Sequence, residues 1–239
     1  MKAKLRQVKP HIFVLDFKRH YDLAMSFLRV QETYESPNPK FRGQQFGILE
    51  FMDWYVHHYK RSCFTYPHDW GGFNVPSRIL DLVYGNKFPS DRAPKSAKDR
   101  RAYVEWAMTV ARVQVRDWTT YDEFMARAHF ELKLDHPTYY LVGISGGNES
   151  TLKHETAHGL YFTSPEYKTA ADKLVRDLPK RVKDRMWGYF RSIGYDKSVF
   201  VDETQAYLAT GLTKTLKKYS YISSRQAPFR KLFKTYSSV

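Results

Sequence analysis

The stretch from residue 138 to residue 158 constrains the fold more than any other part of the sequence. Residues 138–144, Thr-Tyr-Tyr-Leu-Val-Gly-Ile, are mostly aromatic, apolar or β-branched over the usual length of a strand. The next four residues, Ser-Gly-Gly-Asn, interrupt that run. Ser150 or Thr151 can then cap a helix that continues at least to His158. The sequence therefore predicts a sheet strand that leads directly into a helix.

The residues before this stretch are predicted to be mainly helical. Apolar side chains recur at helical spacing in four segments, at about 23–34, 48–59, 99–115 and 121–127. Residues 12–15 form a short apolar run that predicts a buried strand, and residues 130–134 alternate apolar and polar, which favours a second strand. We interpret 64–75 as an aromatic-rich loop and 87–98 as an exposed, proline-bearing linker.

The residues after His158 are also predicted to be helical. Pro165 can begin a helix and Pro179 interrupts it, and a short helix at 203–210 ends at Gly211. These patterns indicate an α+β fold, with a mainly helical amino-terminal half and a small β-sheet. We expect three segments that together form one compact unit, at 1–90, 99–211 and 212–239.

Composition limits the kinds of site and location that this chain can have. Cys63 is the only cysteine, so an internal disulfide is impossible and a metal must be held by histidine and carboxylate. The chain has no run of 18 apolar residues and no apolar stretch of signal-peptide length near Met1, so we expect no membrane span and an intracellular location. The formal net charge of +14 favours a polyanionic partner, although solvated lysines would account for it equally well.

The helix predicted after residue 148 carries the motif His-Glu-Thr-Ala-His at 154–158. Residues four apart lie on one helix face, so His154 and His158 can hold the same ion, for which zinc is the expected metal. Glu155 falls on the same side and could take a proton from a water on the metal without binding the metal itself. The alternative is a surface or core helix whose two histidines do not share a metal ion.

A catalytic zinc usually has three protein ligands, and the third must here be an acid. The chain has no histidine after His158, and most of the later acids alternate with lysine and arginine as on solvated helix faces. Glu203 differs, because it begins a short apolar helix in a basic region. Its neighbour Asp202 is explained either as the cap of that helix or as a partner of a ligating imidazole. We therefore predict Glu203 as the third ligand.

These motifs resemble the zinc metallopeptidases whose third ligand is glutamate, the gluzincins. The resemblance rests on His-Glu-Thr-Ala-His at 154–158 and Asp-Glu-Thr-Gln-Ala-Tyr at 202–207, and covers roughly 138–211. It implies that His154, His158 and Glu203 are ligands and that Glu155 is the general base. It also implies a zincin-like pair of active-site helices. The metzincin pattern does not fit, because Ser164 stands where its third histidine would be.

The gluzincin resemblance further implies a strand at 138–144 on the sheet edge, where an extended peptide is bound. Tyr140, Val142 and Gly143 would then contact the substrate. Residues 36–43 and 69–74 resemble an uncharacterised microbial or phage family, to which no activity is attached. On this basis we expect the protein in the cytoplasm of a microbial or infected host cell.

Two further features are candidates for function. Tyr161 lies one turn after His158 and Tyr207 one turn after Glu203, so either hydroxyl could donate to an oxyanion, although each tyrosine is also explained by packing. Residues 211–239 carry basic side chains and no acid, interleaved with aromatic residues; the basic side chains are Lys214, Lys217, Lys218, Arg225, Arg230, Lys231 and Lys234. Such a segment can bind nucleic acid or another polyanion, or can pack its rings on the core with lysines outward.

The sequence thus predicts a zinc-dependent hydrolase that acts on a peptide or protein. Two alternatives remain: a nucleic-acid-associated protein that uses the same site on bound proteins, and a non-catalytic binding protein with a structural or vestigial zinc.

Overall fold

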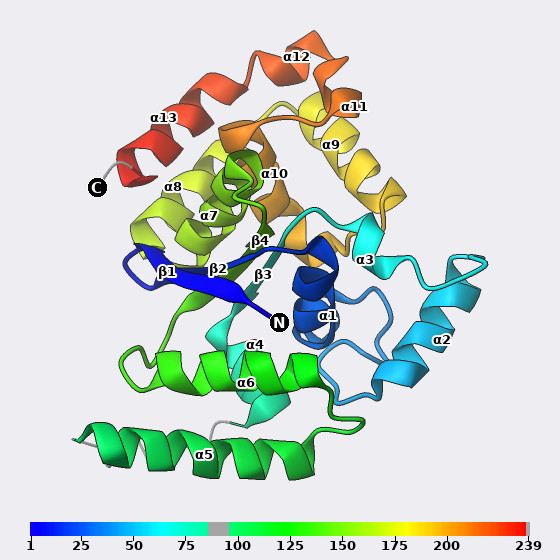
Figure 1. Cartoon of the computed structure of the whole chain (residues 1–239). Coiled ribbons are helices and arrows are strands. Elements are labelled where there is room, and N and C mark those ends of the chain that lie inside the picture. The colour runs from blue at the N-terminus through cyan, green and yellow to red at the C-terminus, as the bar shows by residue number, and fades with distance from the viewer. Residues whose placement is uncertain (86–95, 238–239) are drawn as a thin grey trace.

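A mixed four-stranded sheet separates two layers of helices (Figure 1). The computed structural model describes residues 1–85 and 96–237. The sheet order is β1-β2-β4-β3, with β2 parallel to β4 and the two outer pairs antiparallel. The strands are β1 (Ala3–Lys9), β2 (Ile12–Phe17), β3 (Phe73–Pro76) and β4 (Tyr140–Ser145). The α+β fold is therefore confirmed.

Alternation along the two central strands produces two separate cores. Phe13, Leu15 and Leu141 face the layer formed by the amino-terminal helices. Val14 and Val142, which pair in register, face the opposite layer. Because successive side chains of a strand point to opposite faces, the same two strands anchor both layers.

The first helical layer comes from the amino-terminal half of the chain. Its helices are α1 (His20–Glu35), α2 (Ile48–His58), α3 (Tyr66–Asp69), α4 (Ser77–Tyr84), α5 (Ala97–Gln114) and α6 (Thr120–Lys133). The buried Arg29 of α1 links several segments of this layer by hydrogen bonds. It donates to Asp122 of α6 and to the carbonyl groups of Phe46 and Arg116. Of the linker predicted at 87–98, only 96–98 are described, where Ser96 caps α5.

The second layer contains the histidine helix and the carboxy-terminal helices. They are α7 (Glu149–Thr163), α8 (Pro165–Arg176), α9 (Lys180–Ser192), α10 (Phe200–Thr210), α11 (Lys214–Lys217), α12 (Ser220–Ser223) and α13 (Gln226–Ser237), with a 3-10 turn, η1 (Lys197–Val199), before α10. Gly159 lets α7 lie directly on β2, since a Cβ there would be 2.8 Å from Ile12 Cδ1. In the part of the chain that the structure describes, no helix is long and apolar enough to cross a bilayer.

Two predictions of secondary structure are wrong, and the edge strand β1 was missed. Residues 130–133 continue α6, which Thr119 and Asp122 begin with a capping box, because a five-residue alternation is too short to distinguish a strand from a helix end. The predicted loop at 64–75 contains α3 and most of β3. Strand β1 was not predicted, because it lies on the sheet edge and most of its side chains are polar or exposed.

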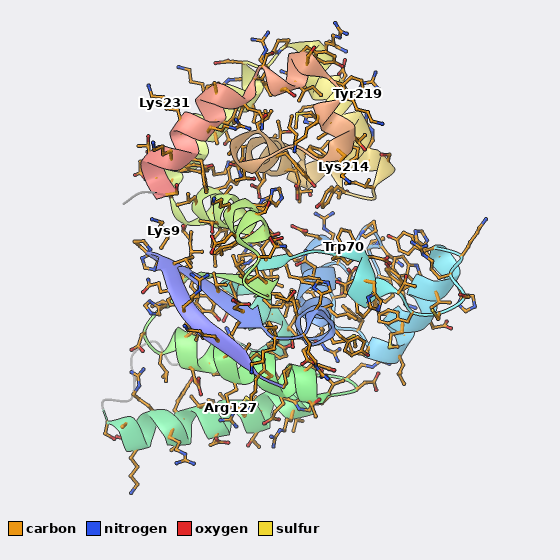
Figure 2. All side chains as sticks on the ribbon, turned by 45° about the horizontal axis from the view of Figure 1, so that its top comes forward. Lys9, Trp70, Arg127, Lys214, Tyr219 and Lys231 are labelled. Carbon is orange, nitrogen blue, oxygen red and sulfur yellow. The ribbon has the colours of Figure 1, made fainter. Side chains whose placement is uncertain are left out.

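The carboxy-terminal segment packs on the rest of the molecule. Phe229 of α13 is buried, while Tyr219, Tyr221 and Phe233 pack against the core formed by α8–α10. All seven of its lysine and arginine residues are exposed. The packing that we gave as the alternative explanation of the aromatic residues is therefore observed, and it leaves a basic outer surface. Lys214 and Lys231 lie on this surface, at the end of the molecule opposite Arg127 (Figure 2).

Candidate metal centre

Helix α7 presents His154 and His158 on one face, as their spacing requires. The helix begins after Asn148, whose side chain accepts the amide proton of Thr151 at 3.1 Å, so Asn148 is the cap rather than Ser150 or Thr151. The preceding glycines, Gly146 and Gly147, have φ values of +63° and +66°. These left-handed conformations turn the chain sharply from β4 into the helix.

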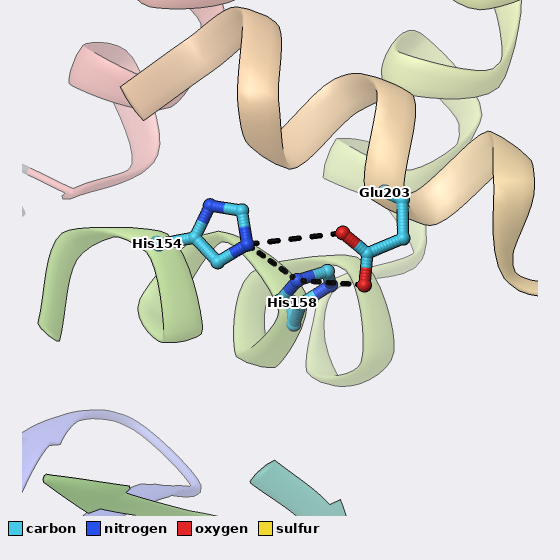
Figure 3. Close-up of side chains that lie close together, drawn as sticks. All are labelled: His154, His158 and Glu203. Atoms are coloured by element: carbon cyan, nitrogen blue, oxygen red, sulfur yellow. Dashed lines mark hydrogen bonds and ion pairs between the residues drawn. The ribbon is translucent and has the colours of Figure 1, made fainter. Parts of the chain in front are cut away.

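Helix α10 brings Glu203 to the two histidines (Figure 3). His154 Nε2 lies 3.3 Å from His158 Nε2. The carboxylate of Glu203 faces both rings, with Oε2 at 3.8 Å from His154 Nε2 and Oε1 at 3.7 Å from His158 Nε2. Among the described residues, these three form the one group of histidine, cysteine or acidic side chains close enough to share an ion.

The donor set fits a zinc ion. Two nitrogens bound tetrahedrally at the usual zinc distance of about 2.0–2.1 Å would be about 3.3 Å apart. The separation of the two imidazole nitrogens matches this value, and the carboxylate oxygens are a few tenths of an ångström farther away. Glu203 is 4% exposed, and its Oε2 has no hydrogen-bond partner in the described chain. A buried carboxylate oxygen without a partner is costly, and a bound cation would remove that cost.

Asp202 orients one of the imidazoles instead of capping the helix. Its Oδ1 lies 2.9 Å from His158 Nδ1, which leaves Nε2 facing the metal position. Helix α10 begins three residues earlier than predicted, so Asp202 is in the first turn and cannot be the cap. A carboxylate bound to the far nitrogen of a ligating histidine is a common partner in zinc sites.

Burial and neighbouring charges shift the pKa values of all three residues of the triad. Burial and the neighbouring His158 lower the pKa of His154 to about 3, so its ring is neutral, as a ligand must be. The pKa of Glu203 is raised by burial to about 7. The pKa of His158 is raised well above its usual value, because the negative charges of Asp202 and Glu203 outweigh the effect of burial.

Glu155 lies beside the triad and is held by residues from another part of the chain. The carboxylate is 6% exposed, and burial raises its pKa. Its Oε2 accepts a hydrogen bond of 2.6 Å from Asn74 Nδ2 on β3, and the Asn74 side-chain oxygen accepts one from the hydroxyl of Tyr140. At Gly72 a Cβ would be 2.7 Å from Glu155 Oε1 and would also collide with Thr151. Glu155 is therefore fixed by an amide and by a close approach of backbone.

Asn74 and Gly72 were not predicted as site residues. The segment 69–74 was noted only for its resemblance to an uncharacterised family, and its spacing from the histidine helix carries no signal that the two meet. They meet because β3 pairs with β4, which leads into α7.

The candidate tyrosines have different surroundings. Tyr161 donates to Asp172 and accepts from Lys168. Two hollows adjoin the triad, an open groove and a smaller cavity, and Tyr161 lines neither. Its predicted role in the site is therefore wrong. The Tyr207 ring lies 4.7 Å from the His154 ring and lines an open groove. Tyr195, which was not predicted, lines the same groove and a smaller cavity, and its hydroxyl favours the charged form of Glu203.

Strand β4 is not at the sheet edge, which contradicts the position that the gluzincin resemblance implied. It has β2 on one side and β3 on the other. Tyr140 and Val142 are buried, and a Cβ at Gly143 would be 2.5 Å from Phe27 Cε2, so Gly143 serves the close packing of α1. The edge strand nearest the triad is β3, which pairs with β4 on one side only.

No protein-family model, curated protein or solved structure matches this chain. The groove at the triad has a volume of about 760 Å³, and its walls include Trp70, Tyr207 and Lys217. His154 and Glu155 line both this groove and the smaller cavity, so both the metal position and the carboxylate are accessible from outside.

The metal ligands are tested by removing each acid separately. Protein purified without chelator should hold about one zinc per chain, and Glu203→Ala should lose it, because zinc needs three protein donors here. Asp202→Asn should retain zinc but bind it roughly 10- to 100-fold more weakly, as expected for a residue that only orients a ligand. Elemental analysis and competition with a chelator measure both effects, and Glu166→Ala, an exposed acid, is the control. If Asp202→Asn lost the metal while Glu203→Ala kept it, the assignment would be reversed.

The contact between Asn74 and Glu155 is tested by a double-mutant cycle. Asn74→Ala and Glu155→Ala should show a coupling of about 0.5–3 kcal/mol in the free energy of unfolding, because each removes the same buried hydrogen bond. Asn74→Ala combined with Glu166→Ala should be additive within about 0.5 kcal/mol. Urea unfolding of the zinc-loaded proteins gives these values. Additivity in the first cycle would contradict the contact.

Proposed function

We propose that this protein is a zinc-dependent hydrolase that cleaves peptide bonds. The observation that carries the proposal is the position of Glu155. This buried carboxylate lies on the same helix as two of the three candidate ligands, outside the ligand group itself, and lines the same groove. A structural zinc site has no need of such a group, whereas hydrolysis needs a base that does not bind the metal.

The residues of the site have distinct roles in this proposal. A zinc ion held by His154, His158 and Glu203 would supply Lewis-acid chemistry, lowering the pKa of water and polarising a carbonyl group. Glu155 acts as the general base and takes a proton from the attacking water. Asn74 holds the Glu155 carboxylate in one orientation. Tyr207, beside His154, is the candidate donor to the oxyanion that forms during attack.

The open groove supports a peptide as the substrate. Its walls come from α3, α7 and the segment after α10, and include Asp69, Thr151 and Thr213. The edge strand β3 is not fully free, because the amide of Asn74 is 3.4 Å from Gln31 Oε1 of α1. A peptide that added to β3 would have to displace this side chain.

Exchange of the general base tests the mechanism. Glu155→Gln keeps the size of the side chain and removes its basicity, so it should retain zinc while lowering peptide hydrolysis by roughly 100-fold or more. Cleavage of a mixed peptide library, zinc content and melting temperature should be measured on both proteins. Glu149→Gln, an exposed change on the same helix, is the control. A Glu155→Gln variant that cleaves as fast as the parent would exclude this mechanism, and a zinc-loaded parent that cleaves nothing would favour the binding-protein alternative.

The second candidate function is association with nucleic acid. The carboxy-terminal segment exposes seven basic side chains, and a second groove of about 760 Å³ lies between α9 and α11–α12. In this groove Arg181 stacks on Tyr221 at 4.0 Å and Arg185 on Tyr219 at 4.6 Å. Guanidinium groups beside aromatic rings are suited to phosphates and bases.

Salt dependence tests this second function. If the basic surface contacts DNA, the Lys214→Gln/Lys218→Gln variant should reduce the slope of log affinity against log salt by about 0.9 for each lost phosphate contact. Lys98→Gln/Arg101→Gln, at the start of α5 on the opposite side of the sheet, is the control (Figure 1). Equal slopes for both variants and the parent would contradict a role for this surface.

A further inference from the structure

A small cavity beside the triad has an unusual charge for this protein. We call it the acidic cavity; four glutamates line it, Glu32, Glu35, Glu155 and Glu203, and no lysine or arginine does. Yet the chain contains 39 lysine and arginine residues against 25 aspartate and glutamate residues. The cavity has a volume of about 70 Å³, room for a few waters or one small cationic group.

Two of these glutamates have no role in the proposed mechanism. Glu32 and Glu35 come from the last turns of α1, and Glu32 is 7% exposed. In the described ranges, no lysine, arginine or histidine lies within ion-pair distance of either carboxylate. Gln31 donates to Glu35 Oε2 at 2.8 Å, which holds that carboxylate in place. Burial without a counter-charge raises the pKa of Glu32 to about 7 and that of Glu35 to about 8, and a cationic ligand beside them would favour their ionised forms.

The other walls of the cavity also suit a cation. Trp54, Tyr55, Tyr59 and Trp70 line it, and aromatic faces attract ammonium and guanidinium groups. Two buried polar atoms of lining residues have no partner in the described chain: Trp70 Nε1 and Glu203 Oε2. A bound metal would give Glu203 Oε2 a partner. The indole N–H of Trp70 is a donor that can bind a carbonyl group of a ligand in the cavity.

We propose that the acidic cavity binds a positively charged nitrogen group of the substrate, an ammonium or a guanidinium. This inference rests on the proposed hydrolase function and adds its substrate class. A phosphate or carboxylate would meet four glutamates and no lysine or arginine, and the two histidines in the walls, His154 and His158, already belong to the candidate ligand group, so anionic groups are disfavoured. A second metal ion is disfavoured as well, because among the residues placed in the structure Glu32 and Glu35 do not converge with a third ligand. The cationic group can be a lysine or arginine side chain or the amino terminus of a peptide.

Direct binding tests the cavity without relying on catalysis. Zinc-loaded full-length protein should bind n-butylammonium and n-butylguanidinium more tightly than butyrate or butanol, measured by calorimetry or ligand-observed NMR. Glu32→Gln and Glu35→Gln should each weaken the binding of the cations roughly 10-fold or more, since each removes a buried charge partner. Glu131→Gln, the same change on the exposed face of α6, should have no effect. The half-buried Glu35 provides a second variant if Glu32→Gln does not fold.

Cleavage assays separate the two sources of the cation. Peptide pools should carry lysine and arginine, leucine, or glutamate at a fixed position, each with a free or an acetylated amino terminus. Faster cleavage of the lysine and arginine pools identifies a side-chain pocket, whereas loss of cleavage on acetylation identifies an amino-terminal pocket. Cation binding that depends on Glu32 and Glu35 without any cleavage would contradict the hydrolase function but leave the cavity assigned. Cleavage with equal binding of all probes, or a second zinc lost in Glu35→Gln, would overturn the cavity proposal.

Discussion

The packing of α10 along α7 is the contact on which the candidate site depends, because the two helices carry all three converging ligands. A buried amide fixes their relative position. Gln205 Nε2 donates to the carbonyl of Ala157 on α7 and to Asp202, while its Oε1 accepts from Tyr167 of α8 at 2.7 Å. A polar group that is fully buried must satisfy its hydrogen bonds, so a slip of one residue between the helices would leave several groups unpaired. The same amide thus sets the register of α10 and the orientation of Asp202 toward His158.

The site brings three acidic side chains together around one imidazole. Asp202, Glu203 and Glu155 surround His158, and against the effect of burial their negative charges raise its pKa. Glu203 and Glu155 respond to burial with raised pKa values, which is how buried acids reduce their charge when no cation is present. A divalent ion between the rings and Glu203 would make the ionised form favourable. Metal binding and the stability of this layer are therefore expected to be coupled.

Sequence patterns predicted the parts of the site that lie within single helices. The spacing of His154 and His158 needs only helical geometry, and Glu203 followed from the lack of a later histidine. The residues that surround these ligands are brought there by contacts between segments far apart in the sequence. Asn74 reaches Glu155 because a four-residue strand pairs with β4, and four residues give too little periodicity to predict a strand. Glu32 and Glu35 lie on α1, whose apolar face was predicted correctly. The sequence around them does not indicate that the last turns of α1 face the histidine motif of α7. The strand β4 itself was predicted, whereas its central place in the sheet depends on β3 and could not be.

The distribution of charge constrains how the two proposed functions could coexist. Basic side chains cover the carboxy-terminal helices, while the acidic cavity lies where α1 meets α7 and α10 and has no lysine or arginine in its walls. A polyanion is attracted to the outer surface but repelled by four glutamates at the site. Nucleic acid is therefore disfavoured as the group that enters the cavity, whether or not it binds the protein elsewhere. A basic polypeptide has the opposite preference, since the cavity attracts it and the outer surface does not. If both proposals hold, nucleic acid on the outer surface would neutralise the charge that repels such a substrate, and the basic segments of a protein bound to that nucleic acid would be brought to the site.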